Sequence, residues 1–207
     1  MDILYQDEAL CVCIKPVGLD SQIGVPEALK AQLGGEFYPV HRLDENVGGV
    51  MVYARTSKDA AMLSREIQTG TFVKEYLAQV HGTPPEQAVW EDLLFKDSRK
   101  NKVFVVRRER AGVRKAKLEF TRLTAGETSL VAIRLYTGRS HQIRVQFASR
   151  GFPLVGDHKY GSRDARTAPM LFSYRITFPW KGENRTFTAL PDWAEGPFSE
   201  ENTSRSR

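Results

Sequence analysis

The sequence contains few cysteines and no long apolar run. Two of its 207 residues are cysteine, and Cys11 and Cys13 stand two apart in one apparent strand. Side chains at that spacing point the same way, which is a poor arrangement for a disulfide. No apolar run approaches the roughly 20 residues that a helix needs to cross a bilayer, and the N-terminus lacks the pattern of a signal peptide. We therefore expect a cytoplasmic protein with buried, unpaired cysteines and no membrane partner.

Common signatures of metal and cofactor chemistry are also missing. The four histidines lack metal-ligand spacing, and no second thiol pair completes a zinc site with the Cys-x-Cys pair. No stretch matches a Walker loop or a dinucleotide-binding fingerprint. No Gly-x-Ser-x-Gly motif indicates a serine hydrolase. We therefore expect neither a metal nor a cofactor.

Positive charge is concentrated in one segment of the chain. The net charge is +5, yet residues 96–117 contain ten basic and two acidic residues, while the rest holds 20 basic and 23 acidic ones. A charged loop in solvent would explain this segment. A surface for a polyanion explains it better, because phosphates relieve the mutual repulsion of so many cations. We expect Arg107, Arg108 and Arg110 to contact such a polyanion.

The hydrophobic pattern predicts mostly strands, interrupted irregularly by short helices. We expect helices at 25–33, 57–68 and 141–149, with Thr56-Ser57 and Ser140 as N-terminal caps. With no internal repeat and no linker, the pattern favours a single α+β domain over residues 1–195 and a polar, frayed tail at 196–207. Strands are predicted at 3–5, 10–14, 50–54, 72–82, 89–95, 102–106, 115–123, 128–136, 170–178 and 184–190.

The stretch from His41 to Arg55 places an acid at the edge of a buried strand. Asp44 ends a short charged cluster, and Gly48-Gly49 predicts a sharp turn before the apolar strand that starts at Val50. An acid at such a place is either a structural turn residue in a salt bridge or a nucleophile on a rigid support. The residues alone leave both interpretations open.

Two further stretches carry side chains that could bind or react. In the predicted strand at 72–82, Lys74 and Tyr76 share one face. Tyr76 is either a core residue or a stacking platform with a hydroxyl for proton transfer. In the stretch 135–151, Arg139 and Arg144 could each hold a carboxylate or a phosphate.

Taken together, these motifs resemble the RluA family of RNA pseudouridine synthases. They follow the family's order over roughly residues 2–192, and the HRLD and GR[ST]HQIRV elements are the most specific. The matching residues are Lys15-Pro16-Val17-Gly18-Leu19, His41-Arg42-Leu43-Asp44 with Gly49, Lys74-Glu75-Tyr76 with Val80 and Gly82, Gly138-Arg139-Ser140-His141-Gln142-Ile143-Arg144-Val145, Val155-Gly156-Asp157 with Tyr160-Gly161, and Ala189-Leu190-Pro191.

The resemblance implies a fold, a reaction and a set of roles. The implied fold is the family's catalytic domain, a mixed and mostly antiparallel central sheet flanked by helices and loops, without the S4 RNA-binding domain of many members. These enzymes convert selected uridines in RNA to pseudouridine, so we expect a monomer that binds a stem-loop in rRNA or tRNA. By this resemblance, Asp44 is the nucleophile, Tyr76 stacks on the base and accepts the C5 proton, and Arg144 pairs with the aspartate.

The chemistry of this reaction fits a single carboxylate. An isomerisation adds no water, so it does not need the two opposed carboxylates of a glycosidase. The acid must stay ionised, and a neighbouring guanidinium favours that form. Unstacking the target base costs about a few kcal/mol, which an intercalating Arg42 and an aromatic platform would offset. The other predicted RNA contacts are Lys15, Lys74, Arg139 and His141.

Two other functions stay open from the sequence. One is an RNA-binding or RNA-folding module with impaired catalysis, against which the joint presence of Asp44, Tyr76 and Arg144 argues. The other is a hydrolase, which would need a second general acid that the sequence does not reveal. Family members commonly have Thr-Ser-Gly where this chain has Val47-Gly48-Gly49. We expect this difference to loosen the loop beside Asp44 and to affect substrate preference.

Overall fold

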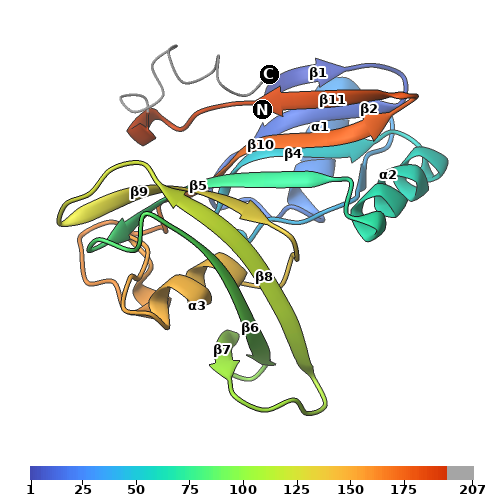
Figure 1. The fold of residues 1–207 in the computed structure, drawn as a ribbon. Helices are drawn as coiled ribbons and strands as arrows, with labels where there is room; N and C mark the ends of the chain where they lie inside the picture. The colour runs from blue at the N-terminus through green and yellow to red at the C-terminus, as the bar shows by residue number, and fades with distance from the viewer. Residues whose placement is uncertain (195–207) are drawn as a thin grey trace.

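The computed structural model describes residues 1–194, which form eleven strands and three α-helices (Figure 1). The predicted tail at 196–207 lies outside the described residues. The helices are α1 (Gly24–Leu33), α2 (Ser57–Thr69) and α3 (Gln142–Ala148), with 3-10 turns η1 (His158–Tyr160) and η2 (Asp192–Ala194). The strands are β1 (Asp2–Gln6), β2 (Leu10–Lys15), β3 (Tyr38–Pro39), β4 (Gly48–Ala54), β5 (Val73–His81), β6 (Gln87–Asp97), β7 (Lys102–Val106), β8 (Val113–Arg122), β9 (Thr128–Leu135), β10 (Leu171–Trp180) and β11 (Glu183–Thr188).

All eleven strands belong to one twisted sheet. Its order is β1-β2-β4-β10-β5-β9-β8-β6-β7, with β11 beside β10 and β3 beside β4. Every strand pair is antiparallel except β4 with β10, where Gly48 lies opposite Phe172. The predicted α+β class, with a mixed and mostly antiparallel sheet, is confirmed. The late strand β10 lies between two early ones, so a long-range crossover brings β4 and β5 to either side of it.

The two N-terminal helices cover opposite faces of this sheet. Leu29 of α1 belongs to the same core cluster as Cys11 and Cys13, whereas Leu63 of α2 packs with Val12 and its neighbours on the other face. Both cysteines are buried and unpaired, as expected. Burying each leucine side chain contributes roughly 1.5–3 kcal/mol. Among the described residues, no helix has the length and apolar character to cross a membrane.

The predicted caps are correct for α2 and wrong for α3. Thr56 accepts a hydrogen bond from the backbone N–H of Asp59, and α2 ends at the left-handed Gly70. The residue before α3 is His141, whose side chain makes no capping hydrogen bond. The Gln142 side chain instead accepts the backbone N–H of Arg139 at 3.0 Å. This bond keeps the chain tightly folded just before α3.

Three strands project from the body of the molecule as an arm, which we call the basic arm (residues 87–122). It consists of β6, β7 and β8 and carries the basic segment predicted from the sequence (Figure 1). Helix α3 packs against the arm, where Val145 meets Leu94, Val103 and Ala116. The arm is therefore attached to the same helix that carries Arg144.

Candidate active site

The turn that follows Asp44 is not where the sequence predicted it. Gly48 and Gly49 lie inside β4, and the chain turns at residues 45–46 instead. Gly49 has a φ of +131°, and a methyl group there would collide with the backbone of Ser173. The glycines therefore do not form a turn. They permit the close parallel approach of β4 to β10 next to Asp44.

Lys15 anchors this turn from inside the protein. Its side chain is fully buried, and its ammonium donates to the carbonyl oxygens of Pro16, Glu45 and Val47 at 2.8, 2.9 and 2.8 Å. Burial lowers the pKa of Lys15 to about 8. All three donors are used, so the predicted RNA contact of Lys15 is incompatible with this geometry. The loop beside Asp44 is anchored, contrary to the looser loop expected from the sequence.

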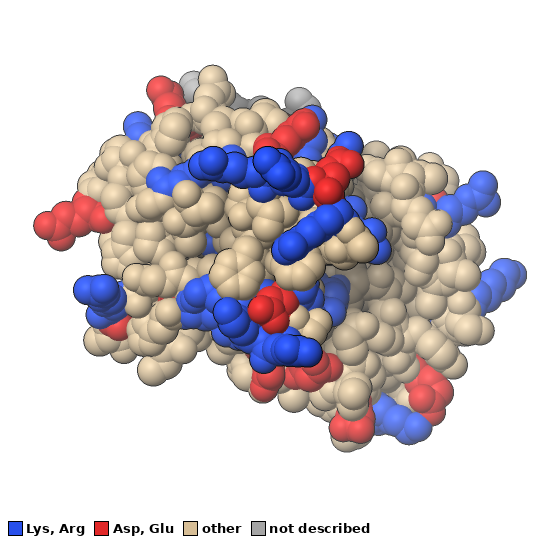
Figure 2. Space-filling model, turned by 90° about the horizontal axis from the view of Figure 1, so that it is seen from below, with Lys and Arg blue, Asp and Glu red and all other residues tan. Residues whose placement is uncertain are grey.

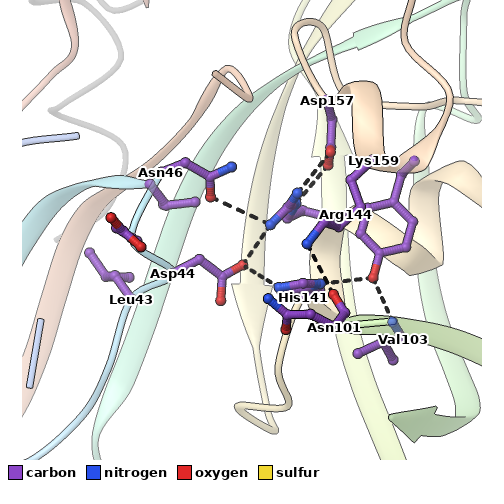
Figure 3. Close-up of polar contacts among 12 residues, drawn as sticks. Leu43, Asp44, Asn46, Asn101, Val103, His141, Arg144, Asp157 and Lys159 are labelled. Carbon is purple, nitrogen blue, oxygen red and sulfur yellow. Dashed lines mark hydrogen bonds and ion pairs between the residues drawn. The ribbon is translucent and has the colours of Figure 1, made fainter. Parts of the chain in front are cut away.

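Asp44, Arg144 and Asp157 form a buried charge cluster (Figure 3). Nη1 of Arg144 donates to Oδ2 of Asp44 at 3.1 Å, while Nε and Nη2 donate to the two oxygens of Asp157 at 2.7 and 2.8 Å. Burial alone would lower the pKa of Arg144, but the hydrogen bonds and charges of Asp157 and Asp44 raise it. Arg144 therefore stays a cation and keeps one nitrogen on Asp44.

Asp157 is the site residue whose role sequence reasoning missed. It lies in the glycine-containing loop at 151–161 that matched the family motifs, but no function was assigned to it. Gly156, just before it, has a φ of +81° and lies against the backbone of Ala168. A usable signal existed, because one carboxylate cannot satisfy the five donors of a buried Arg144. A second acid in a matching motif was therefore to be expected.

Tyr76 lies in the wall of the cavity beside Asp44. It comes from β5, is 5% exposed, and is two strands away from β4, with β10 between them. Burial first and the charge of Asp44 second raise the pKa of Tyr76 above its ordinary value, against a smaller opposing effect of a hydrogen bond with Ser173. The Tyr76 hydroxyl is therefore protonated at neutral pH.

The cavity has a volume of about 440 Å³, within the range of roughly 300–1,000 Å³ typical of small-molecule sites. Its wall combines residues from the loop at 40–47, from β5, and from the segment that connects β9 to α3. Seven of the predicted site residues line it together. These are Arg42, Asp44, Lys74, Tyr76, Arg139, His141 and Arg144.

The sequence model of the RNA pseudouridylate synthase family matches residues 10–149. The dual-specificity RNA pseudouridine synthase RluA of Escherichia coli K12 is 34% identical over 204 residues, which cover 92% of this chain and 93% of that protein. The chain belongs to this family. An uncharacterized RNA pseudouridine synthase of Aquifex aeolicus is 30% identical and covers 94% of this chain. The protein is therefore an isomerase that forms pseudouridine in RNA.

Two human structures share the fold of this pseudouridine synthase. Human RNA Pseudouridylate Synthase Domain Containing 1 superposes with a TM-score of 0.80 at 21% identity, over 92% of this chain and 83% of that one. Human RNA Pseudouridylate Synthase Domain Containing 4 does so with a TM-score of 0.79 at 25% identity, over 95% and 91%. The fold implied by the family resemblance is confirmed.

His141 approaches the synthase's Asp44 from a second direction. Its Nε2 lies 3.8 Å from Oδ2 of Asp44, and its Nδ1 lies 2.9 Å from the hydroxyl of Tyr160. Burial is the main cause that lowers the pKa of His141 to about 4. The imidazole is therefore neutral near pH 7 and does not add a second positive charge beside Arg144.

Lys74 and Arg139 line a part of the synthase cavity that has no acid. No described carboxylate forms an ion pair with either side chain. Lys74 Nζ lies close to Gly138, where an added methyl group would be 3.2 Å away. Burial first and the charge of Arg139 second lower the pKa of Lys74. Nε of Arg139 donates to the carbonyl oxygen of Lys115 at 3.0 Å, so the basic arm holds this side chain in place.

The structure places Arg107, Arg108 and Arg110 outside the cavity of the synthase. All three are exposed in the connection between β7 and β8, at the end of the basic arm. Figure 2 views the molecule from the end where the arm projects, and Lys and Arg side chains gather on that face. Arg110 lies over the ring of Phe95 at 4.5 Å. These arginines lie at the end of the basic arm and are not part of the cavity wall.

Metal ligands are not clustered in the part of the synthase that the structure describes. Within residues 1–194, no group of three or more His, Cys, Asp or Glu side chains could hold a metal ion.

Proposed function

We propose that this pseudouridine synthase uses Asp44 as its nucleophile on a uridine in a stem-loop of rRNA or tRNA. The main support is the asymmetry of the carboxylate. Arg144 and His141 both approach Oδ2, and no residue in the described part of the chain hydrogen-bonds to Oδ1. One oxygen is held while the other is free to attack the substrate.

Tyr76 and Arg42 act on the target base. Tyr76 offers its ring as a stacking surface in the cavity wall. Because its hydroxyl is protonated at rest, Tyr76 gives its proton to N1 of the released base and then accepts the proton that leaves C5, which restores the phenol. Arg42 is exposed at the cavity rim, where its guanidinium fills the stack after the uridine has turned out of the RNA.

The unpaired cations bind the RNA backbone. Lys74 and Arg139 contact phosphate near the target nucleotide, and the basic arm contacts phosphates further along the stem. An impaired RNA-binding module is not favoured, because Asp44, Tyr76 and Arg144 line one cavity. We expect the synthase to act as a monomer in the cytoplasm, which sedimentation of the purified protein and its localisation in the cell will test.

Asp44→Asn tests this function directly. The variant keeps the shape of the side chain and removes the nucleophile, so we expect pseudouridine formation to fall by at least about a thousandfold. RNA affinity should change by less than about twofold, since the carboxylate does not attract phosphate. The substrate RNA comes from mapping pseudouridines across the host's RNA with and without this gene, and the product is measured by mass spectrometry.

Asp2→Asn is the matched control, because Asp2 is an exposed acid on β1. We expect the control to have the activity of the original protein. If Asp44→Asn forms pseudouridine at the same rate as Asp2→Asn, the assigned role of Asp44 is wrong.

A further inference from the structure

Tyr160 lies between the active site and the basic arm. It is 9% exposed, and its hydroxyl accepts the backbone N–H of Val103 on β7 at 2.9 Å. The same hydroxyl lies 2.9 Å from Nδ1 of His141. His141 thus lies between Asp44 and this hydroxyl, and Figure 3 shows His141 in a row of contacts that leads from Asp44 to Val103. Asp157 of the same family motif holds Arg144, whereas Tyr160 does not contact Asp44 or Arg144 through a hydrogen bond.

The hydrogen bonds of this hydroxyl decide which nitrogen of His141 carries the proton. The Tyr160 oxygen already accepts one hydrogen bond from Val103. Burial raises the pKa of Tyr160 to about 12, so the phenol keeps its own proton at neutral pH. Among the described residues, Nδ1 of His141 is the acceptor within reach of that proton. The single proton of the neutral imidazole therefore lies on Nε2, the nitrogen that faces Asp44.

The backbone of His141 is strained in a way that fits a functional position. Its φ of +50° and ψ of 23° lie in the left-handed region, which costs a residue other than glycine about 1–3 kcal/mol. Its side chain does not offset this cost by capping α3. The hydrogen bond from Tyr160 therefore holds the imidazole in the direction of Asp44.

From this geometry we propose that Tyr160 is a positioning residue, which acts through His141 to orient Asp44 for attack through Oδ1. The inference rests on the proposed role of Asp44 as nucleophile. A neutral Nε2–H, 3.8 Å from Oδ2, turns the positive end of its N–H dipole toward the carboxylate without adding charge. A second full cation would stabilise the carboxylate more strongly and make it a weaker nucleophile. Tyr160 thus provides orientation while it preserves reactivity.

Tyr160 also connects His141 to the basic arm, which we propose binds RNA. Val103 belongs to β7, and Lys159, next to Tyr160, donates to the carbonyl oxygen of Asn101 at 3.0 Å. The Tyr160 ring packs with Leu94 and other apolar residues of the arm. A shift of the arm on binding RNA therefore moves the hydroxyl that sets the proton of His141.

Tyr160→Phe removes the hydroxyl and keeps the packed ring, so it tests the positioning role with little risk to folding. We expect kcat to fall about tenfold, which is typical when a residue that orients a functional side chain is replaced. KM and RNA affinity should change by less than about twofold. Tyr38→Phe is the control, because Tyr38 is exposed on β3, and it should have the kcat of the original protein.

Two measurements separate positioning from a merely structural role. Nitrogen-15 NMR of the free protein should show His141 protonated on Nε2, and Tyr160→Phe should mix the two tautomers. The acid limb of the kcat profile should also move to higher pH, because neutral His141 loses a hydrogen-bond donor to Nδ1. The other charges near His141, from Asp44, Arg144, Lys159 and Asp157, are the same in both proteins.

A double variant supplies the decisive comparison. In a His141→Gln background, Tyr160→Phe should lower kcat by less than about twofold further, because the tyrosine acts through the imidazole. If the two substitutions lower kcat independently, so that their effects multiply, the proposal is wrong. It is also wrong if His141 is protonated on Nδ1 or if Tyr160→Phe has the kcat of the original protein. The NMR measurement tests Tyr160 without any catalysis. The activity of Asp44→Asn tests the proposed function, so the two proposals can fail separately.

Discussion

Two parts of the cavity wall differ in how their positive charge is balanced. Arg144 lies between two carboxylates, Asp44 and Asp157, and its donors are used within the protein. Lys74 and Arg139 line the same cavity without an acid partner among the described residues. A paired guanidinium holds its geometry before substrate arrives, whereas an unpaired ammonium with restricted hydration becomes more stable when a phosphate reaches it. This difference supports our proposal that the paired part acts in the chemistry and the unpaired part binds RNA.

Asp157→Asn removes one of the two carboxylates that pair with Arg144, and after Asp44→Asn it should have the largest effect on kcat. Arg144 loses the partner that fixes its plane, so Asp44 loses its orientation and kcat should fall by about a hundredfold. RNA affinity should stay within about twofold. Removing one member of a buried pair should also lower the free energy of unfolding by about 3 kcal/mol. Kinetics at saturating RNA and urea unfolding measure the two effects.

Asp92→Asn is a matched control for that experiment. Asp92 accepts two hydrogen bonds from Arg150, at 2.8 and 3.1 Å, away from the cavity wall. This control should lose stability while it keeps kcat. If both variants lose kcat equally, the effect of Asp157 is one of general stability and not of orientation.

Lys74→Met removes a cation from the unpaired part, and it should lower RNA affinity while it leaves kcat unchanged. Methionine keeps most of the length of the side chain and removes the charge, so RNA affinity should fall about tenfold, as expected for one charge-assisted phosphate contact. The rate at saturating RNA should change by less than about twofold. Lys58→Met removes an exposed charge on α2 and should bind RNA normally. A lower kcat with unchanged affinity would assign Lys74 to the chemistry instead.

Replacing Arg107, Arg108 and Arg110 by glutamine extends the comparison to the basic arm. Exposed charges contribute little individually, so we expect an affinity loss of about fivefold at low salt. The logarithmic dependence of affinity on salt should become shallower by about 2, because three cations no longer displace counterions. Binding measured over a salt series gives this slope. An unchanged slope would show that the arm faces something other than RNA.

Sequence motifs predicted the residues that line the cavity better than the residues that support them. Asp44, Tyr76 and Arg144 lie in short motifs, so their shared cavity could be anticipated from the family resemblance. Their chemical roles stay predictions. The position of the Gly-Gly pair depends on β10 pairing with β4 across more than a hundred residues, which local patterns do not report. The resemblance also put Lys15 among RNA-binding residues. The residues next to Lys15 in the sequence do not reveal that its side chain is buried against backbone carbonyls.

Acid sensitivity distinguishes the two parts of the cavity wall once more. Burial, with the charge of Lys74, lowers the pKa of His41 to about 3, and the pKa of His141 is lowered to about 4 although Asp44 opposes the shift. An unfolded chain protonates both near their ordinary value of about 6.5. It therefore binds more protons, and stability should fall as pH drops from about 6.5 toward 4, by at most about 1.4 kcal/mol per pH unit for each histidine.

The two histidines should respond to their neighbours in opposite directions. Lys74→Met removes a nearby cation and should raise the pKa of His41, which makes the loss of stability smaller below about pH 5, where the folded protein begins to bind the proton. Asp44→Asn removes an anion and should lower the pKa of His141 further. NMR titration of the imidazole protons reads both shifts, each expected within about one pH unit. If neither pKa shifts in these variants, burial alone controls the histidines, and charge balance does not distinguish the two parts of the cavity.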